Sequence, residues 1–292
     1  MITLKEVVKT FDNYTAINRL NLNVKKGSIY GLVGVNGSGK TTCIKHLAGL
    51  YRQDEGLVLI DGENVHNNRN LKERMGYIPD ELYFFNQYTM KRLAKFYANM
   101  YPKWNEERFT RLTDTLKLPN LPIKRFSKGM QKQAAFVFVM SIMPDFLLLD
   151  EPIDGLDPIV RKTIFKEIIE DVTERSTTVL VSSHNLKEMD DICDAIGIIK
   201  QGHMVIEKDL DDLKSNIHKI QVAFKDEVDL AAIGLNILSS ERVGSVSLII
   251  VKGEENDIFE TIKTAEPLIY DRLPLTLEEV FVYETEAANE II

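Results

Sequence analysis

Apolar and polar positions alternate near the start of the chain, over residues 2–8 and again over 17–24. Asp12 and Asn13 lie between the two runs. Alternation with a period of two is typical of strands that bury one face, and the polar pair indicates a turn. The chain therefore begins with two strands that we expect to pair in the antiparallel sense.

Further along, short apolar runs alternate with segments of helical period. Strands that alternate with helices indicate an α/β fold whose main sheet is mostly parallel, with helices on both faces. The pattern predicts strands at 57–60, 75–78, 146–150 and 177–181, helices within about 89–117 and at 126–143 and 160–173, and a hairpin over 196–207.

A polar stretch at about 209–215 divides the chain. We predict a first domain at 1–210 and a smaller α+β domain at 215–292. The pattern in the second domain predicts strands at 219–224 and 267–271, a hairpin over 237–251, and helices at 230–233, 257–264 and 276–283. The last helix has an apolar face, which favours a regulatory or dimerisation role for this domain. That face carries Leu277, Val280, Phe281 and Tyr283.

Composition limits the partners of the protein. The net charge is −8 over 292 residues, so we expect no nucleic-acid partner. The longest apolar stretch, 134–143, is shorter than the roughly 20 residues that span a bilayer, and we see no signal peptide. Cys43 and Cys193 fit no metal-ligand pattern and suggest a reduced, cytosolic protein. Any membrane role is therefore expected to involve a partner.

The candidate chemistry begins directly after the apolar run 28–33. Gly34-Val35-Asn36-Gly37-Ser38-Gly39-Lys40-Thr41-Thr42 has the G-x-x-x-x-G-K-T spacing of a phosphate-binding loop. Glycines let successive N–H groups point at phosphate oxygens, and the following helix adds the positive end of its dipole. Lys40 is expected between the β- and γ-phosphates, with the Thr41 hydroxyl on Mg²⁺.

A second group of polar residues follows the predicted strand 146–150. Asp150 is placed to hold Mg²⁺, and Glu151 to orient an attacking water. Ser127 and Gly129 open an apolar helix, where a Ser-x-Gly start is either a second anion site or an ordinary N-cap. Ser127 lies 23 residues before Asp150, and that position favours the anion site.

Together these motifs resemble the nucleotide-binding domain of ATP-binding cassette (ABC) transporters over about residues 1–210. The resemblance implies a P-loop NTPase of ABC type, with a mostly parallel sheet core, an antiparallel β subdomain and a helical subdomain at about 83–143. The motifs, in the order of the family, are Phe11, the phosphate loop, Asp80 after 76–79, the signature Ser127–Gly129, the acidic pair Asp150 and Glu151, the D-loop 154–157, and Ser182-Ser183-His184.

The resemblance also implies a role for each of these residues. Two such domains meet head to tail around two ATP molecules, so Ser127 and Gly129 would contact the γ-phosphate of the partner's ATP. Asp157 would bridge to the opposite site, His184 would touch the γ-phosphate, and Glu151 would polarise water. ATP would be held by Phe11 stacked on adenine and by Asn36, Gly37, Ser38, Gly39, Lys40, Thr41 and Thr42, and Mg²⁺ by Thr41, Asp80 and Asp150.

Three residues depart from the family pattern. Asp80 stands where the family usually has Gln, so it can still bind Mg²⁺ but adds negative charge near the phosphates. Lys128 and Met130 replace the usual Gly and Gln of the signature. Lys128 either adds positive charge for the partner's ATP or, as we expect, faces solvent. Because Glu151 and His184 are both present, we predict an active ATPase.

Two aromatic assignments remain open in the sequence. Phe11 fits a core aromatic as well as the adenine stack, and Tyr14 is a rival for the stacking position. A second group of aromatics is expected to line a groove for a membrane subunit, although a subdomain core would use the same residues. This second group is Tyr83, Phe84, Phe85 and Trp104.

The resemblance extends to one bacterial exporter branch through 101–107, the Ser-Lys-Gly-Met signature and 275–283. Export of an amphipathic peptide, toxin or antibiotic is therefore the expected process. The implied partners are an integral membrane permease and a second nucleotide-binding subunit, as a homodimer or a paralogous heterodimer, at the cytoplasmic face of the cell membrane. The alternative is a soluble ABC-type ATPase in DNA or ribosome processes. Only 46 residues separate Asp80 from Ser127, too few for the long coiled coil of the DNA type.

Overall fold

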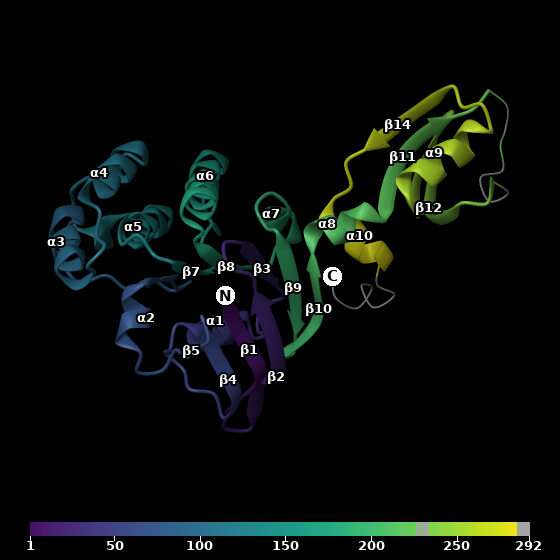
Figure 1. The fold of residues 1–292 in the computed structure, drawn as a ribbon. Coiled ribbons are helices and arrows are strands. Elements are labelled where there is room, and N and C mark those ends of the chain that lie inside the picture. The colour runs from purple at the N-terminus through teal and green to yellow at the C-terminus, as the bar shows by residue number, and fades with distance from the viewer. Residues whose placement is uncertain (226–227, 229–232, 285–292) are drawn as a thin grey trace. The chain divides into compact units, whose positions relative to one another are not determined.

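The computed structural model describes residues 1–225, 228 and 233–284, except for the side chains of 213–215 and 281–284. The chain divides into two compact units, Met1–Glu207 and Lys208–Ile292 (Figure 1). The first unit contains two sheets and the second unit contains one, and each unit has its own hydrophobic core. Within the described ranges, no helix combines the length and the apolar character that a bilayer span requires.

The first unit begins with the expected antiparallel sheet, whose strand order is β2-β1-β4-β5. β1 pairs with β2 on one side, where Ile2 lies opposite Val24, and with β4 on the other, where Ile2 lies opposite Ile60. All three residues are fully buried because alternate positions of each strand point into the core. The strands are β1 (Ile2–Phe11), β2 (Tyr14–Val24), β4 (Glu55–Ile60) and β5 (Glu63–Asn64).

The second sheet of this unit has the strand order β10-β9-β3-β8-β7-β6. β3 is parallel to β8 and β9, and β7 is parallel to β8 and β6. Every residue of β3, β7 and β8 is buried, as expected for parallel strands covered on both faces. The strands are β3 (Ile29–Val33), β6 (Met75–Ile78), β7 (Phe146–Asp150), β8 (Thr178–Ser183), β9 (Ala195–Lys200) and β10 (His203–Asp209).

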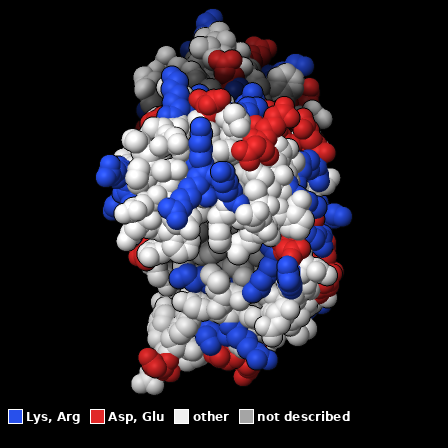
Figure 2. Space-filling view, turned by 90° about the vertical axis from the view of Figure 1, so that its left-hand side faces the viewer, with Lys and Arg blue, Asp and Glu red and all other residues white. Residues whose placement is uncertain are grey.

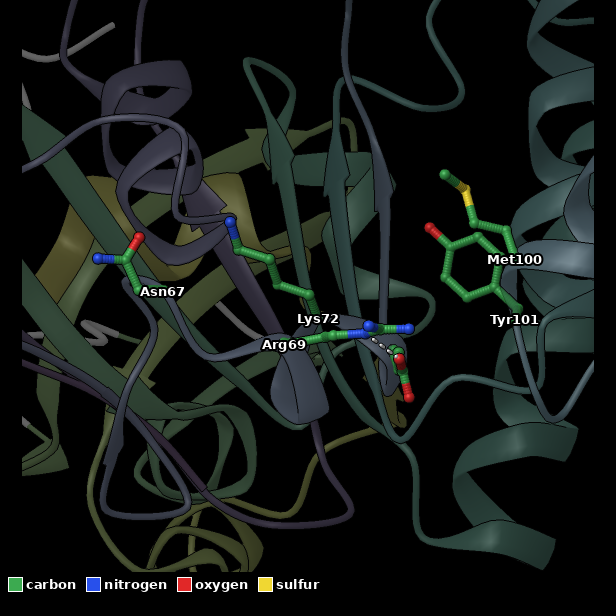
Figure 3. A pocket seen from close by; sticks show the side chains of 6 residues that line it. Asn67, Arg69, Lys72, Met100 and Tyr101 are labelled. Atoms are coloured by element: carbon green, nitrogen blue, oxygen red, sulfur yellow. Dashed lines mark hydrogen bonds and ion pairs between the residues drawn. The ribbon is translucent and has the colours of Figure 1, made fainter.

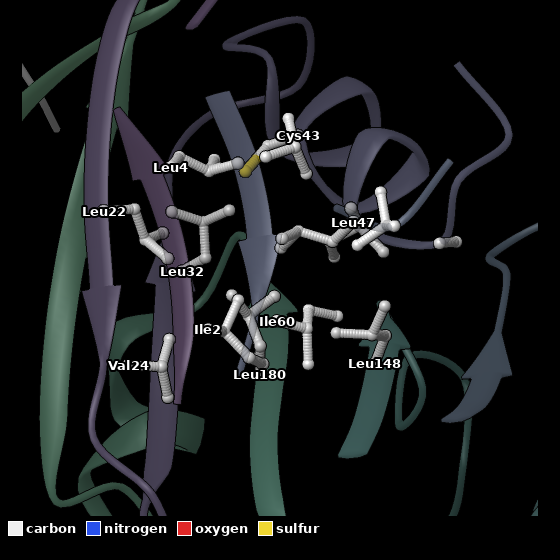
Figure 4. Close-up of a cluster of buried hydrophobic side chains, with 14 of the residues drawn as sticks. Ile2, Leu4, Leu22, Val24, Leu32, Cys43, Leu47, Ile60, Leu148 and Leu180 are labelled. Carbon is white, nitrogen blue, oxygen red and sulfur yellow. The ribbon is translucent and has the colours of Figure 1, made fainter. Parts of the chain in front are cut away.

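One hydrophobic core joins the two sheets (Figure 4). Ile2 and Ile60 come from the antiparallel sheet, Leu32 and Leu148 from the parallel sheet, and Leu47 from α1. Because α1 follows the glycine loop, this packing also fixes the loop that precedes it. Four helices accompany the sheets: α1 (Lys40–Leu47), α2 (Arg69–Glu73), α6 (Pro158–Arg175) and α7 (Leu186–Asp190).

A helical subdomain lies between β6 and β7 in the sequence (Figure 1). Its helices pack around aromatic side chains. Tyr97 stacks on Phe138 with ring centroids 5.2 Å apart, and Trp104 lies 5.5 Å from Phe109. Trp104 therefore belongs to the core of this subdomain rather than to a groove. The helices are α3 (Met90–Met100), α4 (Glu106–Thr115), the 3-10 turn η1 (Ile123–Arg125) and α5 (Lys128–Ser141).

The second unit is an antiparallel sheet of order β12-β13-β11-β14 with α9 packed on one face. Leu277 and Val280 of its last helix are buried. The predicted helix at 230–232 and the side chains of Phe281 and Tyr283 lie outside the described residues. The elements are α8 (Leu210–Ser215), β11 (Ile217–Ala223), β12 (Asn236–Val243), β13 (Val246–Lys252), α9 (Glu255–Lys263), β14 (Ile269–Leu273) and α10 (Leu277–Glu284).

Candidate active site

The loop between β3 and α1 is built closely against neighbouring backbone. A Cβ atom on Gly34 would lie 2.4 Å from the carbonyl oxygen of Ile199. Gly39 has a φ of +114°, and a Cβ there would lie 2.8 Å from the carbonyl oxygen of Ala16. Both positions therefore exclude any side chain, because the loop would have to shift to accept one.

Lys40 points back into this loop and is buried. Its Nζ donates to the carbonyl oxygens of Gly34 at 2.6 Å and Val35 at 3.3 Å, and lies 3.4 Å from Glu151 Oε1. The ammonium group thus lies between the glycine loop and the acid that follows β7. The cavity beside it measures about 230 Å³ and is lined by Tyr14, Ala16, Asn36, Gly37, Gly39, Lys40, Thr41, Thr42, Asp80 and Glu151.

Asp150 ends β7 and has no exposed surface. Its Oδ1 accepts a hydrogen bond from Ser182 Oγ at 2.7 Å, while Oδ2 is buried without a hydrogen-bond partner among the described residues. Burial raises the pKa of Asp150, and hydrogen bonds from Ser182 and Thr41 oppose that rise. A buried carboxylate oxygen without a donor is suited to a cation.

Neighbouring side chains contact both the backbone and the carboxylate of Glu151. Its N–H donates to Ser182 Oγ at 3.1 Å, and its Oε2 lies 3.0 Å from His184 Nδ1. Its Oε1 faces Lys40, and its carbonyl oxygen accepts a hydrogen bond from Lys132 Nζ at 2.8 Å. These contacts hold a backbone with a φ of +48°, a left-handed conformation that is rare outside glycine.

Glu151 and His184, both identified from the sequence, therefore meet in the structure. Lys132, which was not predicted as a site residue, also lies 3.5 Å from Asp80 Oδ1. Nothing in the local pattern singles this lysine out, since it lies within the apolar helix α5 and its partners are 52 and 19 residues away. The contact arises because α5 packs close to β6.

Of the two aromatic residues considered for stacking on adenine, Tyr14 lines the loop cavity and Phe11 does not. The Tyr14 hydroxyl donates to the Gly37 carbonyl oxygen at 3.3 Å. Phe11 packs edge-on against Tyr51, with ring centroids 5.3 Å apart and Lys9 over its ring. Tyr14, which is 58% exposed, is thus the better placed aromatic for a base beside the loop.

Ser127, Gly129 and Asp157 do not line this cavity. Ser127 caps α5 by accepting a hydrogen bond from the Met130 N–H at 3.2 Å, and Asp157 Oδ1 caps α6 through two N–H groups at 3.0 Å. Gly129 lies near Gly155 on a second hollow, which also contains Asp80, Lys128, Lys132 and Asp154. Ser127 is exposed at the end of α5, and so is Lys128, as we expected.

Comparison with known proteins identifies the family. The family model described as ABC transporter matches residues 17–154. The chain is 31% identical over 283 residues to the ABC transporter ATP-binding protein YtrB of Bacillus subtilis (strain 168), which covers 97% of each chain. This chain belongs to the ABC transporter ATP-binding family.

Two further matches support the assignment of this ABC protein. The lantibiotic transport ATP-binding protein SrtF of Streptococcus pyogenes is 32% identical over 214 residues, 72% of this chain and 92% of SrtF. A solved dimeric structure of a bacterial ABC transporter cassette, 23% identical, has a TM-score of 0.65 and covers 72% of this chain and 99% of that chain. The predicted family and ABC-type α/β fold are confirmed.

Membership of this family gives the chain its general activity. It is an ATP-binding subunit whose ATPase activity is coupled to transport, as the motifs predicted. Subunits of this kind dimerise and work with membrane permeases.

Proposed function

We propose that this ABC ATPase powers the export of an amphipathic peptide or antibiotic through a separate permease, at the cytoplasmic face of the cell membrane. Lys40 and Glu151 line one cavity, and Glu151 also contacts His184, which supports hydrolysis at this site. Relatives such as SrtF, named for lantibiotic transport, support the class of substrate.

The phosphates of ATP would bind along the loop. The N–H groups of residues 36–42 and the start of α1 offer donors and a positive dipole end to the phosphate oxygens. Lys40 Nζ now contacts two neutral carbonyl oxygens, and a phosphate oxygen is the stronger acceptor for an ammonium group. The adenine would stack on Tyr14 beside the loop.

The residues present also fit a magnesium ion. Asp150 Oδ2 has no hydrogen-bond donor among the described residues, the Thr41 hydroxyl is close enough to affect the pKa of the same carboxylate, and both Thr41 and Asp80 line the cavity. Such oxygen ligands are those that Mg²⁺ prefers, and the ion would neutralise charge on the β- and γ-phosphates. Asp150 and Thr41 would hold it, with Asp80 as a further acid within the cavity.

Glu151 would act as the general base. Its carboxylate faces the loop and is oriented by His184, so it is placed to accept a proton from a water that attacks the γ-phosphate. His184 is partly exposed and would contact the same phosphate. The base and its orienting group thus come from the ends of two adjacent strands, β7 and β8.

The remaining motif residues would serve a second subunit. Ser127 and Gly129 do not line the loop cavity of their own chain, and Ser127 is exposed at a helix start that can bind an anion. In a head-to-tail dimer, identical or paralogous, they would meet the γ-phosphate of the partner's ATP, with Asp157 beside them. Each ATP site would then be complete only in the dimer.

Substitution of Glu151 by Gln tests the catalytic assignment. We expect hydrolysis to fall by about 10²- to 10⁴-fold, the range for loss of a general base, while ATP binding persists. The control is Glu170→Gln, which changes the same charge on the exposed side of α6. Hydrolysis that survives Glu151→Gln would show that the base lies elsewhere.

A surface of the helical subdomain would receive the permease. Tyr83 and Phe85 are 78% and 50% exposed, whereas Phe84 is 8% exposed, so its expected place in a groove is wrong. Phe84 is buried, whereas the residues on both sides of it are exposed. The α3 and α4 side of the molecule also shows groups of basic side chains at its centre (Figure 2).

A hollow of about 450 Å³ adjoins this surface, between α2 and the end of α3 (Figure 3). Met100 and Tyr101 form an apolar wall, and Arg69 with Glu73 forms an ion pair on the other side. An apolar wall with charged residues at its rim suits a short amphipathic segment of another subunit.

Co-purification with a co-expressed permease subunit tests this contact. The double variant Tyr83→Ala with Phe85→Ala should lose the permease while it binds ATP normally, because both side chains are exposed. Leu57→Ala, an exposed apolar residue on β4, is the control. Unchanged co-purification of the double variant would exclude this surface.

The C-terminal unit is proposed to be a regulatory or dimer-stabilising domain. Lys219 of β11 and Glu279 of α10 form an ion pair at 2.6 Å, and Leu277 and Val280 are buried, so α10 is part of a folded unit. Truncation after Ser215 tests the role. We expect weaker dimerisation or an altered ATPase rate, and unchanged values of both would contradict the proposal.

A further inference from the structure

Lys132 connects the helical subdomain to the end of β7. Its side chain is only 12% exposed, and its Nζ donates a 2.8 Å hydrogen bond to the carbonyl oxygen of Glu151. The same Nζ lies 3.5 Å from Asp80 Oδ1. A lysine seldom has so little exposure without a partner for its charge, and here the two oxygens supply it.

The backbone of Glu151 needs such support. A left-handed conformation outside glycine costs of the order of 1 kcal/mol and persists only when surrounding contacts fix it. Ser182 holds the N–H of Glu151 and Lys132 holds its carbonyl oxygen. Pro152 already restricts the peptide group after Glu151, so loss of the second contact would permit a small shift of this backbone rather than free rotation, and the carboxylate would shift with it.

The charges around the site point to a second task for the same lysine. Asp80 and Glu151 place two carboxylates on the pocket that would receive the triphosphate, and the buried Asp150 adds a third next to them. Lys40 serves the loop, whereas Lys132 is the cation paired with Asp80. Asp80 is half exposed, so the pair is partly screened by water, but it removes part of the repulsion toward an incoming phosphate.

We propose that Lys132 is a positioning residue for hydrolysis, which orients Glu151 through its backbone carbonyl and offsets the charge of Asp80. This inference rests on the proposed function, in which Glu151 is the base. Lys132 lies about one helical turn after Ser127 and Gly129 on α5. It therefore links the helix that would contact the partner's ATP to Glu151, the general base for the ATP bound by its own chain. Displacement of a reacting group by about 1 Å can cost about 100-fold in rate.

Steady-state ATPase measurements on the full-length chain test the proposal. Lys132→Gln should lower kcat by about 10- to 100-fold. The KM for ATP should rise by no more than about fivefold, and the affinity for a fluorescent ATP analogue should fall by no more than the same factor, because the charge of the half-exposed Asp80 is then unpaired but screened by water. Lys132→Arg, which keeps the charge and can still donate, should recover most of the rate. Lys166→Gln, at an exposed ion pair on α6, is the control and should leave both parameters unchanged.

A double-mutant cycle isolates the charge effect. In an Asp80→Asn background, Lys132→Gln should cost less than in the native chain, because the acid that the lysine neutralises is gone. Melting temperatures, measured in parallel, should agree among all variants to within about 2 °C, since one surface ion pair contributes about 1 kcal/mol or less.

The possible failures are distinguishable. Native kcat in Lys132→Gln, or a loss confined to KM, would overturn the positioning role while leaving Glu151 as the base. A loss of kcat that Lys132→Arg does not restore, or that follows a fall in melting temperature, would also overturn it, because the lysine would then act through stability alone. Persistent hydrolysis by Glu151→Gln would instead remove the proposed function itself.

Discussion

A buried network of ion pairs joins α4 to α6 and should contribute strongly to the stability of the protein. Arg108 Nη1 contacts both carboxylate oxygens of Asp171, at 2.7 and 3.0 Å, and its Nη2 lies 3.4 Å from Glu167. Arg111 binds Glu167 in bidentate fashion, and Arg175 donates to Asp171 at 2.8 Å. Arg108 and both acids are buried, so their charges depend on one another rather than on water.

The size of the effect follows from which charges lose their partners. Breaking a buried pair costs about 3–5 kcal/mol. Arg108→Met leaves each acid with one arginine, so we expect a loss of about 3 kcal/mol, at the lower end. Asp171→Asn weakens two arginines and leaves Arg108 with only the longer contact to Glu167, so it should cost more, about 4–5 kcal/mol.

Urea unfolding followed by tryptophan fluorescence measures these values. Trp104 is the single tryptophan and packs on Phe109 beside Arg108, so it reports on this subdomain. A loss of about 3 kcal/mol should lower the midpoint by about 1.5 M urea at a slope of about 2 kcal/mol per M. The control is Arg69→Met, whose pair with Glu73 is exposed and should be worth below about 0.5 kcal/mol. Equal losses in Arg108→Met and the control would refute the reasoning.

Three further predictions concern the site and the network. Tyr14→Ala should weaken binding of a fluorescent ATP analogue by about tenfold or more, with Phe11→Ala within about twofold; the reverse order would return the adenine to Phe11. Gly34→Ala should abolish ATP binding in calorimetry, because its Cβ would overlap backbone oxygen; retained affinity would contradict the loop geometry. Burial opposes ionisation of Glu167, but Arg111 and Arg108 outweigh it and hold its pKa below the ordinary value. The stabilising contribution of Glu167 should therefore be present above about pH 4.3 and be lost as the pH falls through its pKa in the folded protein. Urea midpoints measured from pH 7 to 3 should depend less on pH in Glu167→Gln than in the native chain.

Residues whose roles depend on local chain geometry were predictable from the sequence. The glycine loop, Asp150 and Glu151 after β7, and His184 after β8 each follow a buried strand, and the carboxyl ends of parallel strands meet at one edge. Their order along the chain was enough to predict the site, and the family assignment followed from it.

Residues that meet through packing were not predictable in the same way. Lys132 lies in a helix whose pattern describes only its apolar face, and its partner Asp80 comes from another element. The sequence analysis singled out neither Arg108 nor Asp171, because only the packing of α4 near α6 buries this ion pair. Phe84 follows the same rule, since a run of three aromatics does not reveal which one points inward.

The two attachments of the helical subdomain differ in strength, and that difference has a mechanical consequence. The contact of Arg108 with Asp171 is buried and costs about 3 kcal/mol or more to break, whereas the contact of Lys132 with Asp80 involves a half-exposed acid and is worth about 1 kcal/mol or less. When the subdomain moves, we therefore expect the network at α6 to stay intact and the end near Glu151 to adjust. Movement of α5, the helix that Ser127 caps, would then first displace the carbonyl group of Glu151, because Lys132 of α5 donates a hydrogen bond to it. An ATPase arranged in this way would orient its base fully only when the signature helix is in place.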